Sequence, residues 1–262
     1  MNINHIHQVT RPTLEIILLF LFGVILISYI LAAIFSSRRH RRWPLFRTMF
    51  WTFGMLCAAL AVTGPIANHA HINFAAHMLG HLLLGMLAPL FLVLAAPMTL
   101  LLRTLNVNVA RCLSRILKSR PLCIVSDPAV ASLLNIGGLW ILYTSDLYGA
   151  IQQNMILHLL VHIHVFSAGY LFTVSMIYID PTPHRTSFVY RAIILVSALA
   201  GHGILSKYIY AQPPRTVPVE QAEIGGVLMY YGGDLIDLFL IIILCLQWFR
   251  ASRPRVIQFG QV

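Results

Sequence analysis

Long apolar segments recur along the whole chain and constrain its fold more than any other feature. A run of roughly 20 apolar residues is long enough to cross the hydrocarbon core of a bilayer as a helix. Because 58% of the residues are hydrophobic and only 10% are charged, the composition excludes a soluble enzyme. The predicted fold is all-α, a single membrane domain over residues 1–262. We expect seven transmembrane helices, at 13–35, 46–64, 72–102, 125–144, 150–178, 188–210 and 222–249.

The charges predict the orientation of these helices. The chain has 18 Lys and Arg against 8 Asp and Glu, which gives a formal net charge of +10. If the N terminus is outside, all of the basic residues except Arg11, Lys207 and Arg215 lie on the inner side. Lys and Arg resist translocation, so we expect the N terminus outside and the C terminus in the cytoplasm. The basic residues then mark topology and contact lipid phosphates, and no nucleic-acid partner is expected.

Histidines are the most informative polar residues of the predicted spans. His77 and His81 are four residues apart, as are His158 and His162, so each pair shares one helical face. His202 lies at a similar depth of its own span, in the outer half of the bundle. Polar groups at bilayer depth are costly and commonly functional. We therefore expect these five histidines to surround one metal ion.

The remaining histidines are weaker candidates for metal ligands. His164 lies two residues from His162 and faces another side of the helix, so we expect it to form a helix-to-helix hydrogen bond, with a place beside the metal as the alternative. A second group of four is expected at the outer surface, either inert or capturing metal near the entrance of the site: His5, His7, His69 and His71.

The ligand types favour copper, with zinc second. Imidazoles with nearby thioethers suit a borderline or soft metal. Most methionines are expected to fill the core. Met155, three residues before His158, is the best thioether candidate. The four cysteines show no CxxC spacing, so neither a disulfide framework nor a thiolate metal site is expected.

An acidic residue near the ligands is expected to control metal release. Imidazole binds a metal only when neutral, so a neighbouring carboxylate changes the affinity of the site. Asp234 is predicted at the right depth of the last span. The alternative is a hydrogen bond from Asp234 to a tyrosine or a neighbouring helix, and Asp237 is expected to make a polar contact.

Three segments resemble one known family. They are residues 77–89 (HMLGHLLLGMLAP) running on to Arg103, residues 142–148 (LYTSDLY) leading to His164, and residues 220–234 (EQAEIGGVLMYYGGD). Together they resemble the CtaG-type family of caa3 cytochrome c oxidase assembly factors over most of residues 72–250.

The resemblance implies a non-enzymatic assembly factor of the bacterial cytoplasmic (inner) membrane. Its expected role is to supply copper to the binuclear-centre copper of cytochrome c oxidase subunit I. The expected partners are that subunit, an outer-side copper donor and the lipid bilayer.

Three other functions remain open. A membrane b-type cytochrome would use His81 and His162 as axial haem ligands. A seven-span zinc hydrolase would use Asp234 and Ser145 around the metal, although no G-x-S-x-G motif is present. A structural assembly scaffold would need no metal at all.

Overall fold

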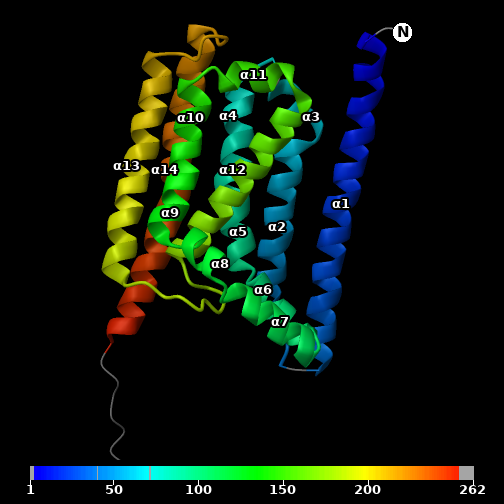
Figure 1. Cartoon of the computed structure of the whole chain (residues 1–262), viewed down its shortest axis with the longest axis vertical. Coiled ribbons are helices and arrows are strands. Elements are labelled where there is room, and N and C mark those ends of the chain that lie inside the picture. Colours follow the sequence, from blue (N-terminus) through cyan, green and yellow to red (C-terminus); the bar gives the residue numbers. More distant parts are fainter. Residues whose placement is uncertain (1–2, 40, 71, 254–262) are drawn as a thin grey trace, which may run out of the picture.

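The computed structural model is a bundle of helices. It describes residues 3–39, 41–70 and 72–253, and the side chains of these residues from Glu15 onward; this part contains no strand. The elements run along the bundle as shown in Figure 1. In chain order they are α1 (Ile3–Arg39), α2 (Leu45–Val62), α3 (Gly64–Ala70), α4 (Phe74–Leu82), η1 (Leu83–Leu87), α5 (Ala88–Leu94), α6 (Pro97–Thr104), α7 (Val107–Leu117), α8 (Arg120–Val125), α9 (Pro128–Ser132), η2 (Leu133–Gly137), α10 (Gly138–Thr144), α11 (Leu147–Gln153), α12 (Met155–Met176), α13 (Phe188–Ala211) and α14 (Val219–Ser252).

Six helices of the described part are long and apolar enough to cross a membrane. A seventh span exists if Pro128–Thr144 and Leu147–Gln153, which meet at a bend of 79°, count as one. Figure 1 shows α9, η2 and α10 rising from the lower to the upper end of the bundle, where α11 lies across the top. The all-helical prediction is confirmed for the described residues, and the seventh span and the orientation remain predictions.

The predicted helix over residues 72–102 is divided in the structure. The chain forms α4, a π-helical turn (η1) and α5, and the helix stops at Ala95. Ala96 has a left-handed φ of 53°, and Pro97 starts α6 in a new direction. Proline cannot continue a helix because it lacks the amide hydrogen and clashes with the preceding turn. A second π-turn, η2, interrupts the rising segment between α9 and α10.

Another correction concerns the start of the fifth predicted span. Instead of one helix over residues 150–178, the chain ends α11 at Gln153 and begins α12 at Met155. Asn154 separates them, because its side chain accepts hydrogen bonds from the amides of Ile156 and Leu157 and so caps α12.

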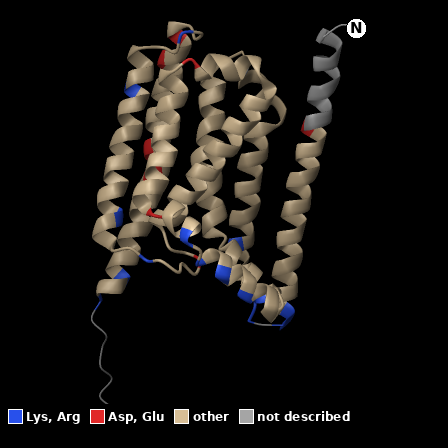
Figure 2. Ribbon diagram, in the orientation of Figure 1, with Lys and Arg blue, Asp and Glu red and all other residues tan. Residues whose placement is uncertain are grey.

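Basic residues gather at one end of the bundle. Figure 2 shows most Lys and Arg at the lower end, where α1 and α14 finish and α6, α7 and α8 lie. The segment after the third span, expected as a loop, forms these short helices. In α7, Val107 and Val109 are exposed beside Arg111 and Arg115. Such an amphipathic helix is typical of a membrane surface.

Close glycine contacts bring the central helices together. A Cβ atom on Gly169 of α12 would collide with the backbone carbonyl oxygen of Gly85 in η1, so these two helices touch through their main chains. A Cβ on Gly226 of α14 would lie 2.9 Å from the Ser206 carbonyl oxygen of α13. Small residues allow this approach in membrane helices. The contacts fix where the histidines of α4, α12 and α13 lie.

Candidate functional site

The upper end of the bundle contains a cavity of about 150 Å³ that we call the histidine chamber. Three histidines line it: His77 from α4, and His158 and His162 from α12. Glu15 of α1 and Met155 also line the chamber. It reaches the surface at Asn68, Gln153 and Met155, which are exposed. The chamber lies at the end opposite to the basic residues, near α3 and α11 (Figures 1 and 2).

His158 and His162 share one face of α12, as their spacing predicts. Their rings stack with centroids 4.4 Å apart and an interplanar angle of 9°. His162 Nδ1 donates to the His158 carbonyl oxygen at 2.9 Å, which fixes the ring against its own helix. Met155, one turn before His158 in the same helix, is 41% exposed. Two imidazoles and a thioether therefore border the same chamber.

His77 is held among aromatic residues that are not among the predicted site residues. Its Nε2 lies 3.1 Å from the Tyr143 hydroxyl of α10, and its ring centroid is 5.0 Å from that of Tyr148 in α11. Both tyrosines belong to the segment 142–148. The sequence does contain a signal for these tyrosines, because they follow an apolar run at the upper end of a span.

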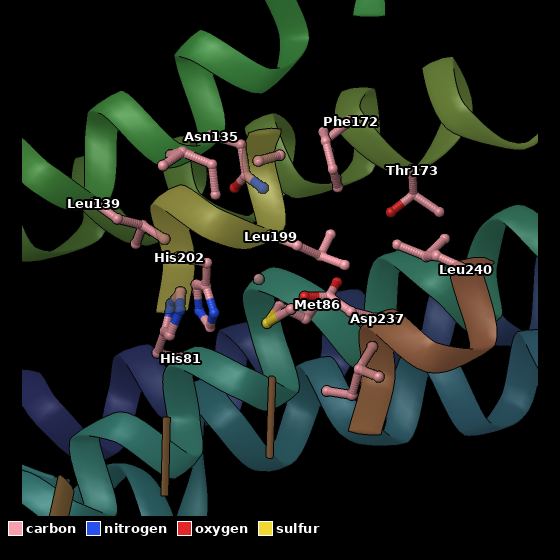
Figure 3. A pocket seen from close by; sticks show the side chains of 14 residues that line it. His81, Met86, Asn135, Leu139, Phe172, Thr173, Leu199, His202, Asp237 and Leu240 are labelled. Carbon is pink, nitrogen blue, oxygen red and sulfur yellow. The ribbon is translucent and has the colours of Figure 1, made fainter. Parts of the chain in front are cut away.

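A second, smaller cavity lies within the bundle, and we call it the buried cavity. Its volume is about 20 Å³, and its lining includes His81 of α4, His202 of α13 and Asp237 of α14. Figure 3 shows the two imidazoles beside each other. In that view the Met86 sulfur lies between this pair of rings and the Asp237 carboxylate. The ring centroids of His81 and His202 are 6.2 Å apart.

Both π-turns contribute to the buried cavity. Gly85 and Met86 come from η1, and Asn135 and Ile136 come from η2. Gly85 leaves room for the His81 ring, since a Cβ there would lie 3.3 Å from His81 Nδ1. π-turns inside α-helices occur frequently at functional sites.

The histidines of the buried cavity have nitrogen atoms without hydrogen-bond partners. His81 is 7% exposed and neither of its ring nitrogens has a partner, while His202 is 3% exposed and its Nε2 has none. A buried polar group left without a partner costs about 1–3 kcal/mol. These nitrogens are therefore available to a small ligand in the cavity.

The carboxylate that lines the buried cavity is that of Asp237, and Asp234, which the sequence predicts beside the metal, does not line it. Asp237 is 3% exposed and lines the cavity, whereas Asp234, one turn earlier in α14, is exposed and does not line it. The buried stripe of α14 indicates the difference: it contains Gly225, Met229, Gly233, Ile236, Asp237, Leu240 and Leu244. Asp237 lies in this helical repeat and Asp234 lies outside it.

The other histidines lie away from both cavities. His164 Nε2 donates to the Leu134 carbonyl oxygen at 3.2 Å, a contact between two helices. His69 Nδ1 donates to the Pro65 carbonyl oxygen at 2.8 Å. The side chains of His5, His7 and His71 lie outside the described part of the chain.

The structure thus places the predicted ligands around two cavities. His77 and His81 leave α4 one turn apart, yet the first lines the histidine chamber and the second lines the buried cavity. Among the described residues, no three His, Cys, Asp or Glu side chains are grouped closely enough to hold a metal ion. A single centre with five histidine ligands stays a prediction.

Comparison with known proteins identifies a family for most of the chain. The family model described as cytochrome c oxidase caa3 assembly factor matches residues 27–251. No solved structure matches the chain significantly.

Similar proteins occur in mycobacteria. Uncharacterized proteins of Mycobacterium bovis and Mycobacterium tuberculosis are each 29% identical over 255 residues, which is 88% of this chain and 38% of the relative. An uncharacterized protein of Mycobacterium leprae is 25% identical over 245 residues, which is 86% of this chain and 37% of the relative. The chain therefore spans less than half the length of these relatives.

Proposed function

Because the chain belongs to the family of caa3 cytochrome c oxidase assembly factors, we propose that it supplies copper to the binuclear-centre copper of oxidase subunit I. The observation that carries the proposal is the histidine chamber, in which His77, His158 and His162 line one cavity that reaches the surface. Imidazole is a good ligand for copper, and the Met155 thioether favours Cu(I).

The position of the chamber supports uptake from outside the cell. Lys and Arg gather at the opposite end of the bundle (Figure 2), and such residues favour the cytoplasmic side. The chamber then faces the outer side of a bacterial cytoplasmic membrane, where a copper donor reaches Asn68, Gln153 and Met155. Subunit I, itself a membrane protein, receives the ion.

The zinc hydrolase alternative has less support. Ser145 Oγ donates to the Ile141 carbonyl oxygen at 2.5 Å, and Asp234 is exposed. Neither residue is among those that line the histidine chamber or the buried cavity. The two side chains assigned to hydrolysis therefore do not meet at either cavity.

The test uses a double variant, His158→Ala with His162→Ala, as the only copy in cells. We expect loss of oxidase activity and of binuclear copper, with the haem of the oxidase retained and the variant present at the wild-type level in the membrane. His164→Ala is the matched control, because it removes an imidazole from the same helix but outside the chamber, and it should leave copper loading unchanged. Full copper loading of the oxidase with the double variant would overturn the proposal in favour of a scaffold.

A further inference from the structure

The buried cavity has the size and chemistry of a separate cation site. We propose that it holds one Cu(I) ion between the imidazoles of His81 and His202 and the thioether of Met86, with Asp237 as the counter-charge. This inference rests on the proposed function only for the identity of the cation, because that function makes copper the expected cargo. It adds a second site, deeper in the bundle than the histidine chamber.

The unpartnered nitrogens are the first argument. Nearly all buried polar side-chain atoms in native proteins have a hydrogen-bond partner or a ligand. Here both ring nitrogens of His81 and Nε2 of His202 have none, and the two rings line the same cavity with centroids 6.2 Å apart. An ion between the rings would take one nitrogen lone pair from each imidazole and remove the penalty at those two atoms, while the other nitrogen of His81 keeps its proton.

The volume of the cavity limits its occupant to a single small particle. A cavity needs roughly 10–15 Å³ of this kind of space to hold one water molecule. The buried cavity has about 20 Å³, so one water molecule or one metal ion can enter it, and a haem or an organic substrate cannot. The choice is therefore between water and a monatomic ion.

The lining favours a soft cation over water. Thioether sulfur is a weak hydrogen-bond acceptor but a good ligand for Cu(I). Figure 3 shows the Met86 sulfur in the cavity, on the side of the imidazoles that faces Asp237. The combination of two imidazoles and one thioether is a ligand set for copper.

Asp237 provides the charge that a buried cation requires. An isolated charge at this depth is expensive, and it is tolerated when an opposite charge lies nearby. Within the described part of the chain, the only ion pair joins Arg215 to Asp146, so no Lys or Arg side chain neutralises Asp237. A monovalent ion beside the Asp237 carboxylate would make the cavity electrically neutral.

The two sites are adjacent along α4. His77 lines the histidine chamber and His81 lines the buried cavity, and four residues of helix advance by about 6 Å. Copper captured in the chamber would thus move by one helical turn to reach the second site.

The experiment detects the sulfur ligand. Full-length protein carrying Met155→Leu, which removes the thioether of the chamber, is purified in detergent and loaded with Cu(I) without oxygen. X-ray absorption at the copper edge should show one sulfur neighbour for copper in the buried cavity, and therefore about half a sulfur per copper when both sites are filled. Met86→Leu in this background should remove the sulfur signal and weaken Cu(I) binding at least tenfold in competition with a Cu(I) chelator. Asp237→Asn should weaken binding to a similar extent while keeping the sulfur signal.

Met229→Leu is the matched control, because Met229 is fully buried but does not line either cavity. It should keep both the sulfur signal and the affinity. A copper spectrum with nitrogen ligands alone, or equal effects of Met86→Leu and Met229→Leu, would overturn the buried site and leave the chamber proposal standing. If the purified wild-type protein bound no Cu(I), both proposals would fail.

Discussion

Gly169→Ala is expected to destabilise the protein because the new methyl group would enter the space of another helix backbone. An alanine Cβ would collide with the Gly85 carbonyl oxygen and lie 2.9 Å from its carbonyl carbon. Carbon atoms in contact prefer about 3.5–4.0 Å, so α12 and η1 must move apart. Overpacking costs about 1–3 kcal/mol, and a backbone obstacle favours the upper value. After subtracting the ~1 kcal/mol by which Ala exceeds Gly in helix propensity, we expect a net loss of ~2 kcal/mol.

The assay is reversible unfolding in mixed micelles with increasing sodium dodecyl sulfate, followed by tryptophan fluorescence. Gly23→Ala is the control, because nothing lies within 4 Å of the position of its Cβ in α1. That variant should be as stable as the wild type or more stable by up to ~1 kcal/mol, from helix propensity alone. If Gly169→Ala were as stable as Gly23→Ala, the two helices would not be in main-chain contact, and the position assigned to Gly85 in the buried cavity would be wrong.

Three further predictions concern single residues. Gly233→Ala should weaken Cu(I) binding in the chelator competition but change unfolding little, because the atoms nearest to its Cβ belong to the His202 ring, a side chain that can move; unchanged affinity would argue against His202 as a ligand. Asp180→Ala should lower stability by about 1–2 kcal/mol in the same unfolding assay, since its carboxylate accepts from the amides of Met98 and Thr99 at the start of α6; wild-type stability would show that this cap is dispensable. Gln212→Cys, in a variant without the native cysteines, should react with an impermeant maleimide from outside intact cells, and labelling only after lysis would reverse the topology.

The sequence predicts much of the bundle because hydropathy and charge act over whole segments. Runs of apolar residues must be helical in a bilayer, where every backbone group needs a partner within the chain. The spacing of His158 and His162 also placed them on one face, because α12 is continuous between them. These predictions depend only on the regular geometry of an uninterrupted helix.

The division of the site into two cavities needed the structure. α4 and α14 are apolar on most of their surfaces, so hydropathy does not indicate which side faces the neighbours. Asp234 and Asp237 therefore looked alike in sequence, although the small residues Gly225 and Gly233 mark the side that contains Asp237. The distance between the His81 and His202 rings depends on how α4 and α13 are rotated, and hydropathy does not give that rotation; the His202 ring also packs against Gly233 of α14.

The π-turn at Leu83–Leu87 makes the number of residues in this segment as important as their identity. A π-turn closes its hydrogen bonds over five residues instead of four, so it accommodates one residue more than an α-helical turn. Deleting that residue would restore a continuous α-helix and rotate everything before it by about 100° relative to everything after it. A relative with every ligand residue but one residue fewer here would therefore present His77 and His81 to different neighbours. Gapped alignment of such a chain would show all the ligands in place and miss that the geometry had changed.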